Sequence, residues 1–276
     1  MKASKVTKII NCLEQAVDSM EDGDANITPV KEMIVSYKEL RKPLMEALEI
    51  SAEASRGRYE HLDDALKLEY FVNWEQNQTV VEQYHALIKS FTSFEYPCME
   101  LFPGTCQFIE QAVAAEPLYV ADRSAYLLDN AASKFNQYYG SKRLMKYVIR
   151  GYDMTSLPQN SFGFIYAINW MRFESLSGLN NFAKSVYDCL MPGGVYLFSY
   201  VPIDQWWALE VTEYGYAAGA DTVELKAALE AIGFEIMDHD TPSPERTYML
   251  CKKPGEIEYI KGSSILAKII DKPEDL

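Results

Sequence analysis

Apolar residues recur at helical spacing through the first third of the chain. They return every three or four positions from Ile9 to Met20, which predicts an amphipathic helix there. Thr28-Pro29 is typical of a helix start, and the amphipathic pattern over Val30–Ala54 contains Pro43, which predicts a kink or a break. A third helical stretch, rich in aromatic residues, covers Leu62–Phe91. Residues 1–93 are therefore expected to form a helical region.

After Phe94 the pattern changes to short apolar runs that alternate with helical segments. Seven runs are typical of strands: Tyr96–Phe102, Leu118–Ala121, Met145–Ile149, Phe162–Ile168, Val195–Val201, Phe234–Met237 and Tyr248–Cys251. The helical segments between them are Gln107–Ala115, Ala125–Tyr138, Ser177–Leu190 and Val223–Ile232. This alternation predicts an α/β domain over residues 94–276, with an open, mostly parallel seven-stranded sheet covered on both faces. The last two runs have no helix between them, which predicts a reversed final strand.

The charge balance argues against nucleic acid as a tightly held partner. The 276 residues include 26 basic and 40 acidic side chains, which give a formal net charge of −14, whereas proteins that grip phosphate backbone are usually basic. The local basic run at Lys142–Arg150 is interpreted as a solvated helix end. No stretch reaches the roughly 18 consecutive apolar residues of a transmembrane helix, and the first residues lack the apolar core of a signal peptide. A cytoplasmic protein is expected.

Cysteine and histidine usage does not favour a metal site. The five cysteines are widely spread and form no C-x-x-C pair, so they are interpreted as reduced and mostly buried thiols. Only three histidines are present, and none has the spacing of metal ligands. We therefore expect no metal.

The segment Cys98–Cys106 reads C-M-E-L-F-P-G-T-C and directly follows an apolar run. A strand that ends in a tight glycine turn and opens a helix is how α/β proteins hold nucleotide-like ligands, because the helix start offers free N–H groups. Glu100 and Gly104 have the positions that such a turn needs. Asp122, eighteen residues after Gly104 at the end of the second strand, is placed to bind ribose hydroxyls, although a solvated acid is an equal alternative.

Two later strand ends carry further candidate residues. Tyr152-Asp153-Met154 follows the third strand, where an acid can recognise an adenine amino group. The fourth strand runs into Asn169-Trp170, and Leu190-Met191-Pro192-Gly193-Gly194 leads into the fifth strand.

Taken in this order, the segments resemble the motifs of the class I S-adenosylmethionine (SAM)-dependent methyltransferases over residues 96–254. Glu100–Cys106 is similar to their first motif in its acid-x-F-x-G-x-G form, Leu190–Gly194 to their L-K-P-G-G turn, and Ala231–Phe234 to their A-G-F step. The resemblance implies a Rossmann-like fold, SAM as the cofactor and methyl transfer as the activity. It also implies a set of cofactor-binding residues: Glu100, Phe102, Gly104, Thr105, Asp122, Asp153, Met154 and Asn169.

The chain departs from the family pattern at two positions. Cys106 replaces the last motif glycine, and Gly163 stands where an aspartate is usual. The segment after the fourth strand, Asn169–Arg172, also lacks the Asn/Asp-Pro-Pro-Tyr sequence of enzymes that methylate base amino groups. The resemblance therefore implies a small molecule or a protein side chain as the methyl acceptor.

No residue is compelling as a general base, and none is required. Methyl transfer is an in-line displacement at a sulfonium, so the protein mainly orients the nucleophile and excludes water. The candidates near the reacting centre are Asn169, Trp170, Tyr200 and Asp204. Further aromatic residues either wall a substrate pocket or pack as a lid against the N-terminal helices: Trp206, Trp207, Tyr214 and Tyr216.

Two other functions stay open. The first is a methyltransferase fold that has lost catalysis and serves as a structural or interaction module, which the eroded glycine motif and a faint resemblance to methyltransferase-like proteins of tailed bacterial viruses favour. The second is a nicotinamide-dependent oxidoreductase, which fits the Pro192-Gly193-Gly194 turn and the reversed last strand less well. In either main interpretation, the N-terminal helices are expected to close over the sheet edge or to form a homodimer or assembly interface.

Overall fold

The fold is described by a computed structural model, which covers residues 2–20, 25–60, 78–104, 106–140, 142, 144–168, 170–213, 217–243 and 246–257. Its centre is a seven-stranded sheet with the order β3-β2-β1-β4-β5-β7-β6. The strands are β1 (Cys98–Leu101), β2 (Leu118–Asp122), β3 (Leu144–Val148), β4 (Phe162–Ala167), β5 (Leu190–Tyr200), β6 (Glu235–Ser243) and β7 (Arg246–Lys252). Strands β1 to β5 pair in parallel, and β7 is antiparallel to both of its neighbours. The predicted Rossmann-like sheet with a reversed last strand is confirmed.

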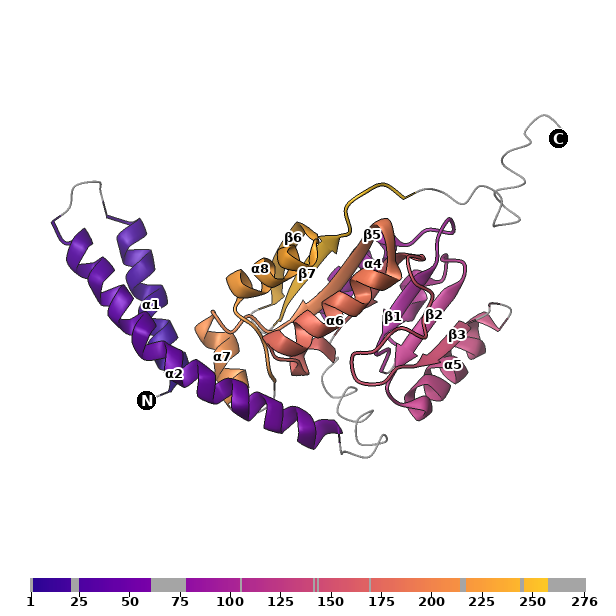
Figure 1. The fold of residues 1–276 in the computed structure, drawn as a ribbon, viewed down its shortest axis with the longest axis horizontal. Helices are drawn as coiled ribbons and strands as arrows, with labels where there is room; N and C mark the ends of the chain where they lie inside the picture. The colour runs from indigo at the N-terminus through magenta and orange to yellow at the C-terminus, as the bar shows by residue number, and fades with distance from the viewer. Residues whose placement is uncertain are drawn as a thin grey trace.

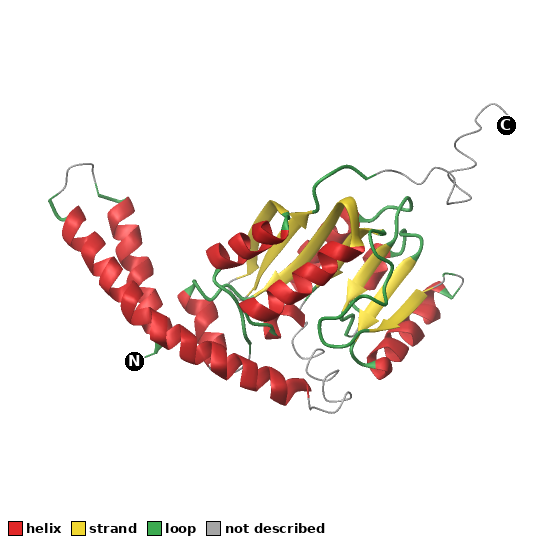
Figure 2. Ribbon diagram, in the orientation of Figure 1, coloured by secondary structure: helices red, strands yellow, loops and turns green. Residues whose placement is uncertain are grey.

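Helices lie on both faces of this sheet (Figures 1 and 2). The longer ones are α1 (Ala3–Asp18), α2 (Ile27–Glu60), α4 (Gln78–Phe91), α5 (Ala125–Tyr139), α6 (Leu176–Cys189), α7 (Trp206–Glu213) and α8 (Thr222–Ile232). Two short 3-10 helices, η1 (Ile109–Ala112) and η2 (Trp170–Phe173), follow β1 and β4.

The two faces of the sheet have separate hydrophobic cores. In β4, Ile165 and Ala167 pack with α6 and α8, whereas Phe164 and Tyr166 pack with α4 and α5. Side chains alternate between the faces of a strand, so both sets of residues in β4 are apolar and buried. The continuous apolar runs in the sequence are therefore the mark of a sheet covered on both sides.

The helix expected over Gln107–Ala115 is wrong, and of the kink or break expected at Pro43 the break does not occur. The segment predicted as a helix over Gln107–Ala115 contains only the four-residue η1. Phe108, Ile109 and Ala112 are all buried in the core beneath α4, and α4 is the helix that covers the sheet there. Pro43 does not break α2, which continues from Ile27 to Glu60. Pro43 lies on an exposed side of the helix, where water can bond the carbonyl that proline leaves without a donor.

The N-terminal helices divide between two places. Helices α1 and α2 lie side by side as a hairpin at one end of the molecule, joined by a small core of Val6, Ile10 and Ile34 (Figure 1). Helix α4 instead shares the core of the sheet. The domain boundary at residue 93 stays a prediction, and α4 on its N-terminal side packs against the sheet. The predicted helix over Leu62–Phe91 is described only from Gln78 onward, and residues 61–77 lie outside the described part.

The hairpin is attached to the α/β part through α7. The Ser4 backbone N–H and hydroxyl donate to the Glu213 carboxylate, at 2.9 and 2.6 Å. The Lys8 ammonium lies 4.3 Å from the ring centroid of Trp206. Trp206 therefore packs against α1, in line with the lid interpretation of this aromatic residue.

Candidate functional site

The strand order reverses between β1 and β4, and this is the point where ligands bind in open α/β sheets. Such ligands lie in the crevice outside the carboxyl ends of the strands. The segments that follow β1, β2 and β4 all meet at this edge, because those strands are parallel neighbours. The first-motif loop, Asp122 and Trp170 therefore all lie at this edge, and their part in binding a cofactor stays a prediction.

The loop after β1 keeps a backbone that suits glycine, although two positions carry side chains. The φ angle is 56° at Phe102, 50° at Gly104 and 64° at Cys106, all in the left-handed region. The Phe102 N–H donates to the Ala121 carbonyl at 2.7 Å, which holds the start of the loop against β2. The Cys106 side chain is buried in the core beneath α4. Thr105 lies outside the described residues.

Phe102, which follows β1, and Trp170, which follows β4, are in direct contact. Their rings stack with centroids 4.6 Å apart and an interplanar angle of 22°, and Phe182 of α6 meets the Phe102 ring edge-on at 5.3 Å. Phe102 is 3% exposed and Trp170 is 5% exposed. The aromatic side chains that follow the two strands at the reversal point are thus in direct contact with each other.

Arg123 covers this aromatic stack from the end of β2. Its Nε donates to the Gly151 carbonyl at 3.2 Å, and its Nη2 lies 3.5 Å from Oε1 of Glu174, whose side chain is fully buried. Glu174 also accepts a hydrogen bond of 3.0 Å from the Tyr152 hydroxyl. The guanidinium carbon lies 5.2–5.7 Å from the centroids of four rings, those of Phe102, Tyr152, Trp170 and Phe182. Sequence reasoning missed Arg123, because a single arginine after a strand carries no motif.

The two strand-end acids have protein partners. Glu100 is buried and accepts a hydrogen bond of 3.2 Å from the Tyr166 hydroxyl; burial, followed by the charge of Glu100, raises the pKa of Tyr166. Asp122 is also buried and accepts from the Ser124 N–H at 2.9 Å. Ser124 in turn caps α5 by accepting from the Leu127 N–H at 3.2 Å. Both acids therefore help to hold the strand ends in place.

The residues predicted for the adenine side have local roles. The exposed carboxylate of Asp153 accepts from the Thr155 N–H at 2.9 Å and from its hydroxyl at 2.7 Å, and these two bonds lower the pKa of Asp153. Met154 is buried in the core with α6. Their part in binding a cofactor stays a prediction.

Two catalytic candidates, Tyr200 and Asp204, converge on the start of α8. The Tyr200 hydroxyl donates to the Thr222 hydroxyl at 3.0 Å, and burial raises the pKa of Tyr200. Asp204 Oδ1 accepts from the Thr222 N–H at 3.1 Å and from its hydroxyl at 2.8 Å. This chain of bonds positions the N-terminus of α8. The candidate Asn169, the side chain of Trp207, and Tyr214 and Tyr216 lie outside the described residues.

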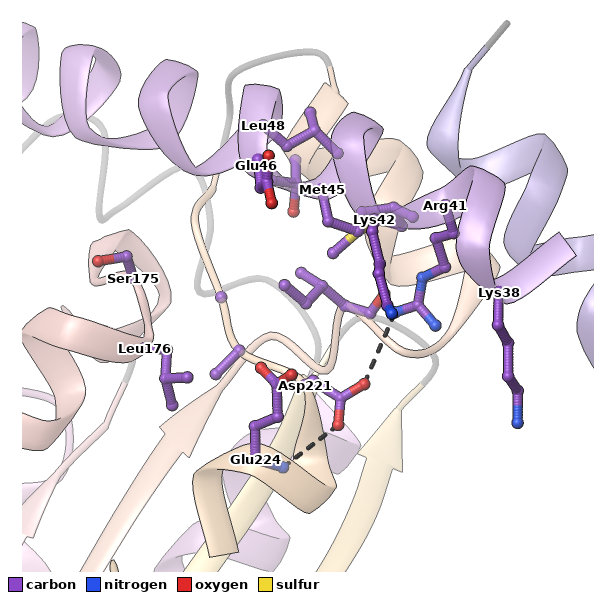
Figure 3. A pocket seen from close by; sticks show the side chains of 15 residues that line it. Lys38, Arg41, Lys42, Met45, Glu46, Leu48, Ser175, Leu176, Asp221 and Glu224 are labelled. Atoms are coloured by element: carbon purple, nitrogen blue, oxygen red, sulfur yellow. Dashed lines mark hydrogen bonds and ion pairs between the residues drawn. The ribbon is translucent and has the colours of Figure 1, made fainter. Parts of the chain in front are cut away.

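A second hollow lies beneath α2, beside the segments that follow β4 and β5 (Figure 3). It has a volume of about 420 Å³. Its walls come from α2, the starts of α6 and α8, and α7: Lys38, Arg41, Lys42, Met45, Glu46, Leu48, Ser175, Leu176, Ile203, Leu209, Thr212, Gly219, Ala220, Asp221 and Glu224. Sequence reasoning missed this cavity, because the basic residues of α2 have the spacing of an ordinary solvated helix face.

The described residues show neither a metal-ligand cluster nor a membrane-spanning helix. In that part of the chain, no three histidine, cysteine or acidic side chains gather as metal ligands would. None of the described helices has the length and apolar character needed to cross a membrane.

Comparison with known proteins gives a consistent result at the level of fold. The chain matches no protein-family model and no curated protein sequence. It is similar to a solved putative methyltransferase in complex with the Haloferax volcanii Trm112 activator, with a TM-score of 0.57, 12% identity, and 69% and 97% of the two chains covered. It is also similar to the N-methyltransferase NodS of Bradyrhizobium japonicum in complex with S-adenosylhomocysteine, with a TM-score of 0.51, 13% identity, and 75% and 98% covered. A geranyl diphosphate methyltransferase in complex with SAM matches with a TM-score of 0.53 and 9% identity, over 63% and 85% of the chains. The chain therefore has the fold of the class I SAM-dependent methyltransferases.

Proposed function

We propose that this protein uses the methyltransferase fold as a binding or structural module, and that it does not hold SAM. The observation that carries the proposal is the stack of Phe102 on Trp170 beneath Arg123 at the point where the strand order reverses. A nucleoside bound there needs open space between the segments after β1, β2 and β4. The mutual contacts of Phe102, Trp170 and Arg123 support our inference that these side chains take up that space and leave too little of it for the cofactor.

The segment after the motif loop supports the same conclusion. A nucleotide-binding glycine turn opens a helix whose first N–H groups face the ligand. Here the chain continues only into the four-residue η1, which is too short to provide such a helix start.

Opening the crevice would be costly. Burial of one large apolar side chain is worth about 1.5–3 kcal/mol, and an aromatic pair adds about 0.5–1.5 kcal/mol. Separating Phe102 from Trp170 and exposing both rings therefore requires several kcal/mol. The total is about 3.5–7.5 kcal/mol. Since about 1.4 kcal/mol corresponds to tenfold in affinity, SAM binding is expected to be weakened by roughly 300-fold to 10⁵-fold.

The second candidate is a SAM-dependent methyltransferase that acts on a small molecule or a protein side chain. It is favoured by the left-handed backbone at Gly104 and by the positions of Glu100 and Asp122 at the strand ends. Arg123 and Phe102 would have to withdraw from the crevice before the cofactor entered. The solved N-methyltransferase and the activator-bound methyltransferase of this fold make such an enzyme a specific alternative.

Calorimetric titration with S-adenosylhomocysteine separates the two functions. We expect no heat of binding from the wild-type protein at millimolar ligand. Phe102→Gly removes the stacked ring at a position whose backbone suits glycine, and it should create measurable binding that a further Asp122→Ala change removes. Phe94→Gly deletes an exposed phenylalanine and is the matched control. Micromolar binding by the wild type that Asp122→Ala abolishes would overturn the proposal and support the enzyme function.

A module of this kind needs a partner surface, and the α1–α2 hairpin is the candidate. Four large apolar side chains of the hairpin are exposed: Ile9, Met33, Val35 and Leu40. We expect a homodimer or an assembly partner to bind there. Light scattering on the wild type and on Leu40→Lys tests the homodimer, since a charge in such an interface should leave only the monomer.

A further inference from the structure

Arg41 is the polar centre of the cavity beneath α2. Its side chain is only 16% exposed, and in Figure 3 it points from α2 toward Asp221 at the start of α8. The Nη2 atom lies 3.4 Å from the Ile203 carbonyl oxygen and 3.6 Å from Asp221 Oδ2. The Nε atom is buried and has no hydrogen-bond partner among the described residues.

These contacts leave the guanidinium poorly satisfied. Both are longer than the 2.7–3.2 Å that N–H···O hydrogen bonds favour, and an arginine has five N–H donors in a planar fork. A buried donor without an acceptor destabilises a protein. A carboxylate in the cavity would accept from the two Nη groups in the two-pronged geometry that arginine prefers, since Nε itself is buried. The state of Arg41 therefore points to an anion.

The charges around the cavity limit this anion to one negative charge. Its walls carry three cations, Lys38, Arg41 and Lys42, and three acids, Glu46, Asp221 and Glu224. The two lysines are exposed and already paired with acids elsewhere, since the Lys38 Nζ lies 2.7 Å from Glu14 and the Lys42 Nζ lies 2.6 Å from Glu39. Three nearby carboxylates repel any anion, and they repel a dianion such as a phosphate monoester more strongly than a monocarboxylate, which a contact with Arg41 alone can hold.

The remaining side chains that line the cavity are mostly apolar, which favours a ligand with an apolar portion. Met45 and Leu48 of α2, Leu176 of α6, and Ile203 and Leu209 surround the space. A volume of about 420 Å³ lies within the range of small-molecule sites. Gly219 forms part of the wall. A side chain at this position would collide with the Val201 carbonyl oxygen, which lies 2.2 Å from an added Cβ.

We propose that this cavity binds a small monocarboxylate with an apolar tail, with the carboxylate on Arg41 and the tail against the leucine and isoleucine wall. The proposal does not rest on the proposed function, since neither Phe102 nor Trp170 lines this cavity. The ligand would bridge α2 and the α/β part, and its binding would stabilise the folded chain.

Thermal unfolding and calorimetry with octanoate test the proposal. Octanoate at millimolar concentration should raise the melting temperature of the wild-type protein, whereas octanamide, its neutral analogue, and octylammonium should not. Arg41→Gln should weaken octanoate binding by about tenfold or more, because it removes a charge-assisted contact. Lys31→Gln removes a charge from an exposed part of the same helix and is the matched control.

A second variant keeps the test decisive if Arg41→Gln does not fold. Leu176→Trp fills the cavity without a change in charge and should abolish binding. The proposal is overturned if the wild type shows no octanoate binding at millimolar ligand, if octanamide binds equally well, or if Leu176→Trp binds octanoate unchanged. Because S-adenosylhomocysteine is titrated separately, failure of this proposal and failure of the proposed function give different results.

Discussion

Arg123, at the end of β2, lies 3.5 Å from the fully buried carboxylate of Glu174, which follows η2. This contact joins segments 51 residues apart in the sequence and lies across the edge where the fold binds ligands. The Arg123 guanidinium also lies over the rings of Phe102 and Trp170. Together these side chains form a largely buried cluster at this edge of the sheet.

The first prediction follows from this ion pair. Arg123→Met should lower the free energy of unfolding by about 2 kcal/mol, because a buried acid loses a charged partner. Urea denaturation measures the change. In the double variant Arg123→Met with Glu174→Gln, the two losses should be less than additive. Additive losses would show that the two side chains do not interact.

The second prediction concerns Gly163, where the methyltransferase family usually has an aspartate. A Cβ at this position would lie 2.3 Å from ring atoms of Tyr96. That ring is held by its hydroxyl, which donates to the Phe91 carbonyl at 2.7 Å. Gly163→Ala should therefore cost about 1–3 kcal/mol of stability, measured by urea denaturation. Gly151→Ala meets no atom within 4 Å and should cost less, although its φ of 58° adds strain. Equal losses for the two variants would contradict this account.

The third prediction concerns cysteine reactivity. Cys12 is exposed, whereas Cys98, Cys106, Cys189 and Cys251 are buried. Brief treatment of the native protein with iodoacetamide should therefore modify Cys12 alone among the five cysteines. Mass spectrometry of peptides measures this, and denatured protein, in which all five should react, is the control. Rapid labelling of Cys98 in the native protein would refute the packing of β1.

The fourth prediction is a pH dependence. Burial raises the pKa of the Cys189 thiol from 9.0 to about 11. Since the unfolded thiol ionises first, the stabilising contribution of Cys189 is complete below pH 9 and is lost as the pH rises toward 11. The free energy of unfolding should fall over this range, and it should fall less steeply in Cys189→Ala. An identical slope in the variant would exclude this group as a source of the effect.

The fifth prediction concerns Lys253, which closes the end of α6. Its ammonium donates to Asn160 Oδ1 at 2.9 Å and to the carbonyls of Tyr187 and Leu190 at 2.8 Å each. Lys253→Met should cost about 1–2 kcal/mol in thermal or urea unfolding, because it removes these bonds at a helix C-terminus. Lys252→Met removes a neighbouring charge as the control, and an equal loss there would show that the carbonyl contacts of Lys253 are unimportant.

The hydrophobic pattern of the sequence was sufficient to predict a mostly parallel sheet with a reversed last strand. Continuous apolar runs at β1, β2 and β4, alternating with helical segments, predict parallel strands covered on both faces, and the missing helix between β6 and β7 predicts the reversed strand. The helix expected over Gln107–Ala115 does not form, and only the short η1 is present. Phe108 and Ile109 are instead buried beneath α4. Local propensity is weak compared with the burial of large apolar side chains.

By itself, the sequence determined the fold class and the positions of Glu100, Gly104 and Asp122 at strand ends, because both follow from short-range periodicity and from the order of segments along the chain. Only the tertiary structure decided what fills the space beyond those ends. The stack of Phe102 on Trp170, the position of Arg123 over it and the cavity around Arg41 all join residues that are distant in sequence. Such contacts depend on how separate elements pack, and no periodicity within one segment encodes them.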